Sequence, residues 1–203
     1  MNGVRLEALA PPDGATAAAA LDVATAYLPP ALLNHSLRVH LWAAARGTTE
    51  GIPFDPELLY VAALFHDIGL VPAFDSHTVA FEEAGGHVAR VFAAGAGWPA
   101  ERRERLYGVI VGHMRPRVDV SVDPEGHLLA RAAATDVVGS EADAYPSRFR
   151  DEVLDRHPRL DFAGVFLACF RDQAARKPAS SAAGAVRSGL PGRMAVNPLD
   201  AST

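Results

Sequence analysis

The stretch that determines the fold is residues 55–69, which read DPELLYVAALFHDIG. Asp55 followed by Pro56 is typical of a helix start, because an aspartate side chain caps the first free amides and proline fits the first turn. The residues that follow are apolar on nearly every side, which predicts a buried helix at the centre of the protein. The pattern stops at Gly69, with His66 and Asp67 just before it.

On either side of this stretch the apolar residues recur mostly at the helical period, and β-branched runs are scarce. We find no internal repeat and no convincing strand pair, so the sequence predicts an all-α protein, a compact single-domain helical bundle. Further helices are expected from Asp13 or Thr16 to Tyr27 and over about 31–46, 81–94, 99–114, 127–138, 146–156 and 160–176. We divide the chain into an N-terminal helical extension (1–30), a helical domain (31–176) and a tail (177–203). The tail is rich in Ala, Ser, Gly and Pro, which predicts disorder or a segment lying on the surface.

The composition excludes several classes of protein. The chain has 203 residues, of which 49% are hydrophobic, and a formal charge of −5, which suits one globular domain and argues against non-specific nucleic-acid binding. It contains no apolar run long enough to span a membrane, and its first residues lack the pattern of a secretory signal. The single cysteine, Cys169, excludes an internal disulfide. We therefore expect a cytoplasmic protein that binds neither nucleic acid nor membrane.

Ionisable residues lie where helix packing would not select them. Asp67 and Asp136 each fall in the last turn of an apolar helix, where the helix dipole is unfavourable to a carboxylate and burial would add several kcal/mol. His35 lies on an otherwise apolar helix stripe, and His66 precedes Asp67. A nearby cation would remove these penalties. Two histidines and two carboxylates without a thiolate suit zinc, iron, manganese or a related divalent ion.

Each of these residues also has an ordinary structural interpretation. His35 could be a hydrogen-bonded core histidine, and Asp136 could form a buried ion pair with Arg131 or Arg90. A His-Asp dipeptide occurs by chance in many sequences. Spacing alone therefore leaves the metal site and the structural interpretation open.

Three motifs follow one another along the chain: NHSLRV at residues 34–39, LFHDIG at 64–69 and TD at 135–136. Together they resemble the HD-domain superfamily, which is all-helical and metal-dependent. The resemblance implies that His35, His66, Asp67 and Asp136 bind one divalent metal ion, with zinc expected first and iron, manganese, nickel or cobalt as alternatives.

Further segments are similar to the cyanamide hydratase-like branch of that superfamily. These are DPELLY at residues 55–60, FEEAGG at 81–86, KP at 177–178 and PGR at 191–193. The last two imply that the tail is at least partly ordered. Two-metal members place a histidine four residues before a pair of small residues, and this sequence has Phe81 there. One metal ion is therefore expected rather than two.

The resemblance also implies roles around the metal. Asp67, His113 and Glu82 are expected to be catalytic, the last two by moving protons. Arg38, Phe81 and His113 are expected to bind the substrate. The alternatives are a structural histidine at 113, a glutamate favoured by its helix N-terminus at 82, and an ion pair of Arg38 with an aspartate.

The resulting functional hypothesis is an enzyme in which the metal activates water. The resemblance implies that this water hydrates a small nitrile-like substrate. The main alternative is an HD-type phosphohydrolase acting on a nucleotide or other phosphoester, for which Arg38, Arg115 and Arg117 are the nearby cations. A third hypothesis is a non-catalytic, metal-stabilised binding module. A small-molecule substrate is the expected partner, and the amount of apolar helix surface is compatible with a homodimer.

Overall fold

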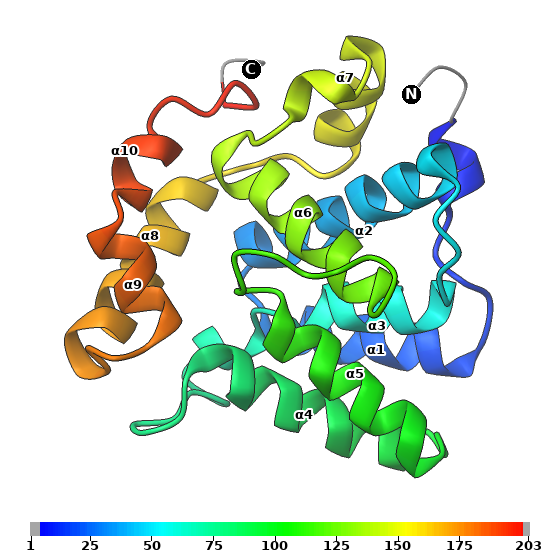
Figure 1. Cartoon of the computed structure of the whole chain (residues 1–203), viewed down its shortest axis with the longest axis horizontal. Helices are drawn as coiled ribbons and strands as arrows, with labels where there is room; N and C mark the ends of the chain where they lie inside the picture. The colour runs from blue at the N-terminus through cyan, green and yellow to red at the C-terminus, as the bar shows by residue number, and fades with distance from the viewer. Residues whose placement is uncertain (1–4, 201–203) are drawn as a thin grey trace.

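A computed structural model describes residues 5–200, and over this range the chain forms helices and no strand, which confirms the all-α prediction. Three short 3₁₀ helices are η1 (Leu6–Leu9), η2 (Ile68–Leu70) and η3 (Ala142–Ala144). The α-helices are α1 (Ala15–Tyr27), α2 (Pro30–Glu50), α3 (Pro56–Phe65), α4 (Phe81–Gly95), α5 (Ala100–Gly112), α6 (Pro124–Val138), α7 (Ser147–Arg156), α8 (Phe162–Arg176), α9 (Ser181–Arg187) and α10 (Leu190–Met194). In Figure 1, α4 and α5 pack side by side, and α8 to α10 stack along one side of the bundle.

Helix α3 is the central helix, as the sequence predicts. Every side chain from Leu58 to Phe65 is buried, and the helix packs against α1, α2, α4, α5 and α6. The Asp55 carboxylate caps it by accepting a hydrogen bond of 3.0 Å from the amide of Leu58. The α-helix ends at Phe65, earlier than the apolar pattern suggests, so that His66 and Asp67 lie in the turn that follows.

Two helix boundaries differ from the predicted ones for identifiable reasons. We expected the second helix to end at Arg46 because Gly47 follows, but α2 continues to Glu50 and ends at Gly51, whose φ is 66°. Gly47 instead permits close packing, since a Cβ there would lie 2.5 Å from the Phe54 ring. Helix α6 begins three residues before its predicted start, because Asp123 caps the amide of Gly126 at 2.9 Å.

The turn after α3 is held by two glycines that allow backbone to touch backbone. A Cβ on Gly69 would lie 2.1 Å from the carbonyl oxygen of Phe81, the first residue of α4. A Cβ on Gly85, one turn further along α4, would lie 2.9 Å from the carbonyl oxygen of Phe65. The start of α4 therefore rests directly on the turn that carries His66 and Asp67.

The first and last segments that the structure describes are part of the same core. In the N-terminal extension, α1 buries Ala20 and Ala24 completely and packs against α2 and α3. The described part of the tail, expected to be disordered or only partly ordered, forms α9 and α10 and buries Leu190 and Leu199. Its Asn197 side-chain amide donates hydrogen bonds to the carbonyl oxygens of the last residues of α6, at 2.9 and 3.1 Å.

The search for membrane spans covered the helices between residues 5 and 200. None of them combines the length and the apolar character that crossing a bilayer requires.

Candidate metal centre

Three side-chain atoms converge at the end of α3. The Nε2 atoms of His35 and His66 lie 3.2 Å apart, and the Oδ2 atom of Asp67 lies 3.3 Å from each of them. All three side chains are at most 2% exposed. Ligand atoms bound at 2.0–2.1 Å to a tetrahedral ion are about 3.3 Å apart, so this triangle has the dimensions of three metal ligands.

Hydrogen bonds to the other ring nitrogens turn the two Nε2 lone pairs toward this point. The Nδ1 of His35 donates to Asp136 at 2.7 Å, and the Nδ1 of His66 donates to the carbonyl oxygen of Ala63 at 2.8 Å. The Oδ2 of Asp67 is buried and has no well-formed hydrogen bond within the described chain. Three acceptors face one another without a donor, an arrangement that requires a proton or a cation among them.

The shifted pKa values of Asp67 and His66 are consistent with a site that attracts positive charge. Burial opposes the charged form of Asp67, but the charge and hydrogen bonding of His66 and His35 outweigh it and hold the pKa of this carboxyl well below its usual range. Burial likewise opposes protonation of His66, and the attraction of Asp67 outweighs it and raises the pKa of the imidazole. A divalent ion satisfies the same three groups without a proton.

Asp136, the fourth expected ligand, lies on the other side of the His35 ring. Its Oδ1 accepts hydrogen bonds from Nε of Arg38 at 2.8 Å and from the indole of Trp42 at 2.9 Å. Its Oδ2 accepts from Arg38 at 2.8 Å and from His35, while Arg159 lies 3.5 Å away. In this arrangement the carboxylate orients His35 and is separated from the three-residue cluster.

Arg38 is the ion-pair partner of Asp136, rather than Arg131 or Arg90, the partners considered from the sequence. Burial opposes the charged form of the Asp136 carboxyl, but the positive charge of Arg38 outweighs it and helps to hold the pKa of this carboxyl well below the usual range. The Arg38 side chain is 0% exposed, and its remaining donor group binds the carbonyl oxygens of His157 and Pro158. The structure therefore pairs Arg38 with Asp136. An ion pair with an aspartate was the alternative to substrate binding by Arg38 in the sequence analysis.

His113 lies beside the cluster, where its Nε2 is 4.0 Å from Oδ1 of Asp67. Its Nδ1 donates to the carbonyl oxygen of Ile110 at 2.5 Å, which leaves the Nε2 lone pair facing the site. Burial, reinforced by the charge of His66, lowers the pKa of His113 to about 4. These surroundings favour the neutral form of His113, whose Nε2 carries a lone pair.

Phe81 and Glu82 lie behind this group and outside the cavity lining. The Phe81 ring packs edge-on against His113 with ring centres 5.8 Å apart. Glu82 is 8% exposed, its Oε2 has no hydrogen-bond partner in the described chain, and burial raises the pKa of its carboxyl. The structure thus brings His113 to the candidate metal centre and packs Phe81 against it, whereas Glu82 is buried outside the cavity lining.

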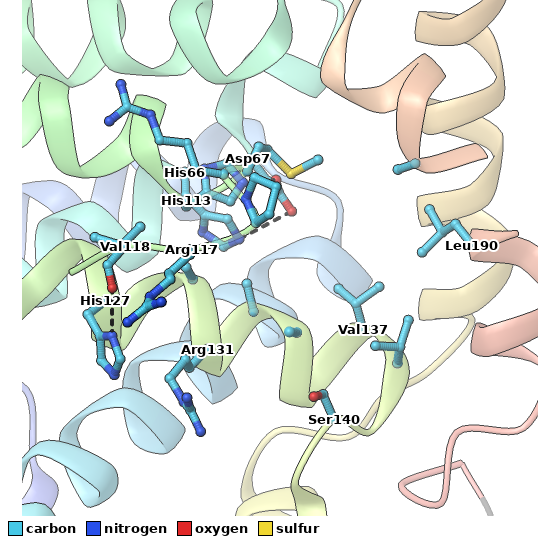
Figure 2. A pocket seen from close by; sticks show the side chains of 18 of the residues that line it. His66, Asp67, His113, Arg117, Val118, His127, Arg131, Val137, Ser140 and Leu190 are labelled. Carbon is cyan, nitrogen blue, oxygen red and sulfur yellow. Dashed lines mark hydrogen bonds and ion pairs between the residues drawn. The ribbon is translucent and has the colours of Figure 1, made fainter. Parts of the chain in front are cut away.

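The cluster opens into a cavity of about 780 Å³. Helix α6 forms one wall, the segment after α5 covers part of it, and Phe166 and Phe170 of α8 close the inner end. Figure 2 shows Leu190 on the side opposite His127, with His66, Asp67 and His113 deeper between them.

Residues of the tail line the cavity on the side away from His127, and the sequence analysis did not assign them to the site. They are Ala185, Leu190 and Arg193. The only signal for them in the sequence was the PGR motif at residues 191–193, which overlaps α10.

A helical domain with a buried His-His-Asp cluster at the end of its central helix is the architecture of a metal-dependent hydrolase domain. Residues 32–134 match the HD domain family, and the chain belongs to this family. Two curated proteins of Saccharomyces cerevisiae, cyanamide hydratase DDI2 and cyanamide hydratase DDI3, are each 28% identical to it over 172 residues. The match covers 83% of this chain and 76% of each yeast protein.

Proposed function

We propose that this protein is a metal-dependent enzyme that adds water to a small nitrile-type substrate. The observation that carries the proposal is the convergence of three possible ligand atoms, from His35, His66 and Asp67, on one point in the lining of a cavity. The similarity to two cyanamide hydratases over most of the chain supports the choice of a nitrile carbon as the electrophile.

The three clustered side chains would hold the ion, with Asp136 keeping His35 in orientation. A divalent ion bound there lowers the pKa of water toward about 7 and polarises the nitrile. His113 accepts a proton from the attacking water at Nε2 and returns it to the nitrile nitrogen. Water oxygen ends on carbon and both water protons on nitrogen, so a nitrile becomes an amide and cyanamide becomes urea. Phe166 and Phe170 add apolar surface to the cavity lining, and the Phe166 ring lies beside His35.

The test is formation of urea from cyanamide by purified protein loaded in turn with zinc, iron, manganese, nickel or cobalt. We expect Asp67→Asn to abolish turnover and His113→Gln to lower kcat by about 100-fold or more. Asp151→Asn, an exposed substitution in α7 with the same change in charge, is the matched control. No urea from cyanamide and no amide from other nitriles with any of the five metals would refute the proposal.

Phosphoester hydrolysis is the second candidate, favoured by one observation. Arg115 and Arg117 line the cavity, and neither forms an ion pair with any residue between 5 and 200. Guanidinium groups near a metal favour a phosphate. Turnover of nucleotides or p-nitrophenyl phosphate without urea formation would establish this activity. Stabilisation by metal without any turnover would instead favour a non-catalytic binding module.

A further inference from the structure

The cavity is much larger than the reacting group requires. Its volume of about 780 Å³ falls in the range of sites that enclose drug-sized ligands, whereas cyanamide has three heavy atoms. From the metal cluster the cavity continues along α6, where Ala130, Ala134 and Val137 offer an apolar surface. A substrate that fills this space carries an apolar segment beyond its reactive carbon.

The outer part of the cavity carries an exposed arginine, Arg117. Arg117 lines it and makes no hydrogen bond or ion pair within the described residues. Figure 2 shows the Arg117 guanidinium beside His127 and α6, on the side away from Leu190. The segment that carries it is held to α6, because Nδ1 of His127 donates to the carbonyl oxygen of Val118 at 2.9 Å.

Besides Asp67 at the cluster, two acidic residues line the cavity, Asp119 and Glu141. The carboxylate of Asp119 accepts hydrogen bonds from the amide and the hydroxyl of Ser121, at 2.9 and 2.8 Å. Glu141 forms ion pairs with Arg46 and Arg131. The charge of Arg117 also acts on Asp119, where, after the hydrogen bonds from Ser121, it helps to lower the pKa of the carboxyl. Arg117 makes no hydrogen bond to any described residue, so its donors remain available for a ligand.

We infer that the preferred substrate is a nitrile with a carboxylate at its other end, joined by an alkyl chain. The nitrile would lie at the metal cluster, the chain against Ala130 in the first half of α6, and the carboxylate on Arg117. A guanidinium donates two parallel hydrogen bonds to a carboxylate, which gives orientation as well as affinity. The inference rests on the proposed function and adds the class of substrate and the residue that selects it.

The kinetic test compares 4-cyanobutanoate with pentanenitrile, which has the same alkyl chain and no charge. We expect kcat/KM to favour the anionic nitrile, and Arg117→Gln to reduce this preference about 10-fold. Arg117→Lys should retain part of it. Arg148→Gln is the matched control, because Arg148 is 90% exposed in α7, lies outside the cavity lining and carries the same charge. Its preference should equal that of the unmodified protein.

Calorimetric titration separates this inference from the proposed function. The probe is glutaramate, the amide formed from 4-cyanobutanoate, with pentanamide as the neutral control. Binding of glutaramate that weakens about 10-fold in Arg117→Gln, and not in Arg148→Gln, supports the carboxylate site whether or not a nitrile is turned over. Equal binding in all three proteins overturns it. Equal kcat/KM for both nitriles also overturns it, while leaving nitrile hydration standing.

Discussion

Replacing Asp136 by asparagine tests whether the network around His35 is structural. The carboxylate accepts four hydrogen bonds of 2.7–2.9 Å, two from Arg38 and one each from Trp42 and His35. Asparagine offers one acceptor oxygen and directs an amide donor at groups that are themselves donors. Arg38 would remain buried without its carboxylate, and removing one partner of a buried ion pair costs about 3–5 kcal/mol.

The assay is thermal unfolding of the metal-free protein. For a chain of this size, a loss of this magnitude lowers Tm by about 6–20 °C. Asp67→Asn is the comparison, because the Asp67 carboxylate faces imidazole nitrogens and no arginine. We expect it to change the metal-free Tm less and to abolish the rise in Tm on adding zinc, which corresponds to about 2.7 kcal/mol at a 100-fold excess over Kd.

Two outcomes would refute this reasoning. If Asp136→Asn leaves the metal-free Tm unchanged and removes only the response to zinc, its carboxylate acts as a ligand and the network does not carry the stability assigned to it. If Asp67→Asn retains the full response to zinc, the cluster of His35, His66 and Asp67 is not the metal site.

Three further predictions concern stability. Burial lowers the pKa of His40 from 6.5 to about 4, so the unfolded chain binds a proton before the folded protein does as the pH falls. The free energy of unfolding contributed by His40 is therefore complete above pH 6.5 and declines by at most about 3 kcal/mol down to pH 4. In urea unfolding at pH 7.5 and 4.5, His40→Phe should reduce this decline. Gly69→Ala should lower the free energy of unfolding by about 3 kcal/mol in the same assay, whereas Gly108→Ala, which meets open space, should not lower it. Asn197→Ala should cost about 1–2 kcal/mol and expose the tail to limited proteolysis, and an unchanged cleavage rate would contradict its anchoring role.

The sequence predicted the helical class and the buried helix α3 because periodicity and capping are local signals. Asp55 and Pro56 identified the start of that helix, and the structure confirms it. The end of α2 was wrong because a glycine has two uses: Gly47 makes room for Phe54 inside the helix, and Gly51 ends it. No local pattern distinguishes a packing glycine from a terminating one.

For the site, the unfavourable placement of buried charge pointed to side chains that the structure brings together, but not to all of their partners. His35, His66 and Asp67 meet as expected, whereas the contact of Asp136 with Arg38 depends on how α2 and α6 cross. Such contacts between distant segments are set by tertiary packing. The homodimer, the identity of the metal and the cytoplasmic location stay predictions.

Because the tail forms part of the cavity wall, its sequence can affect which substrates related proteins accept. The HD match ends at residue 134, yet one wall of the cavity comes from residues 185–193. Ligand residues and that wall are thus encoded in segments that can change independently. Exchanging the last 27 residues, 177–203, between relatives would reshape which molecules fit while leaving the chemistry of the ion intact.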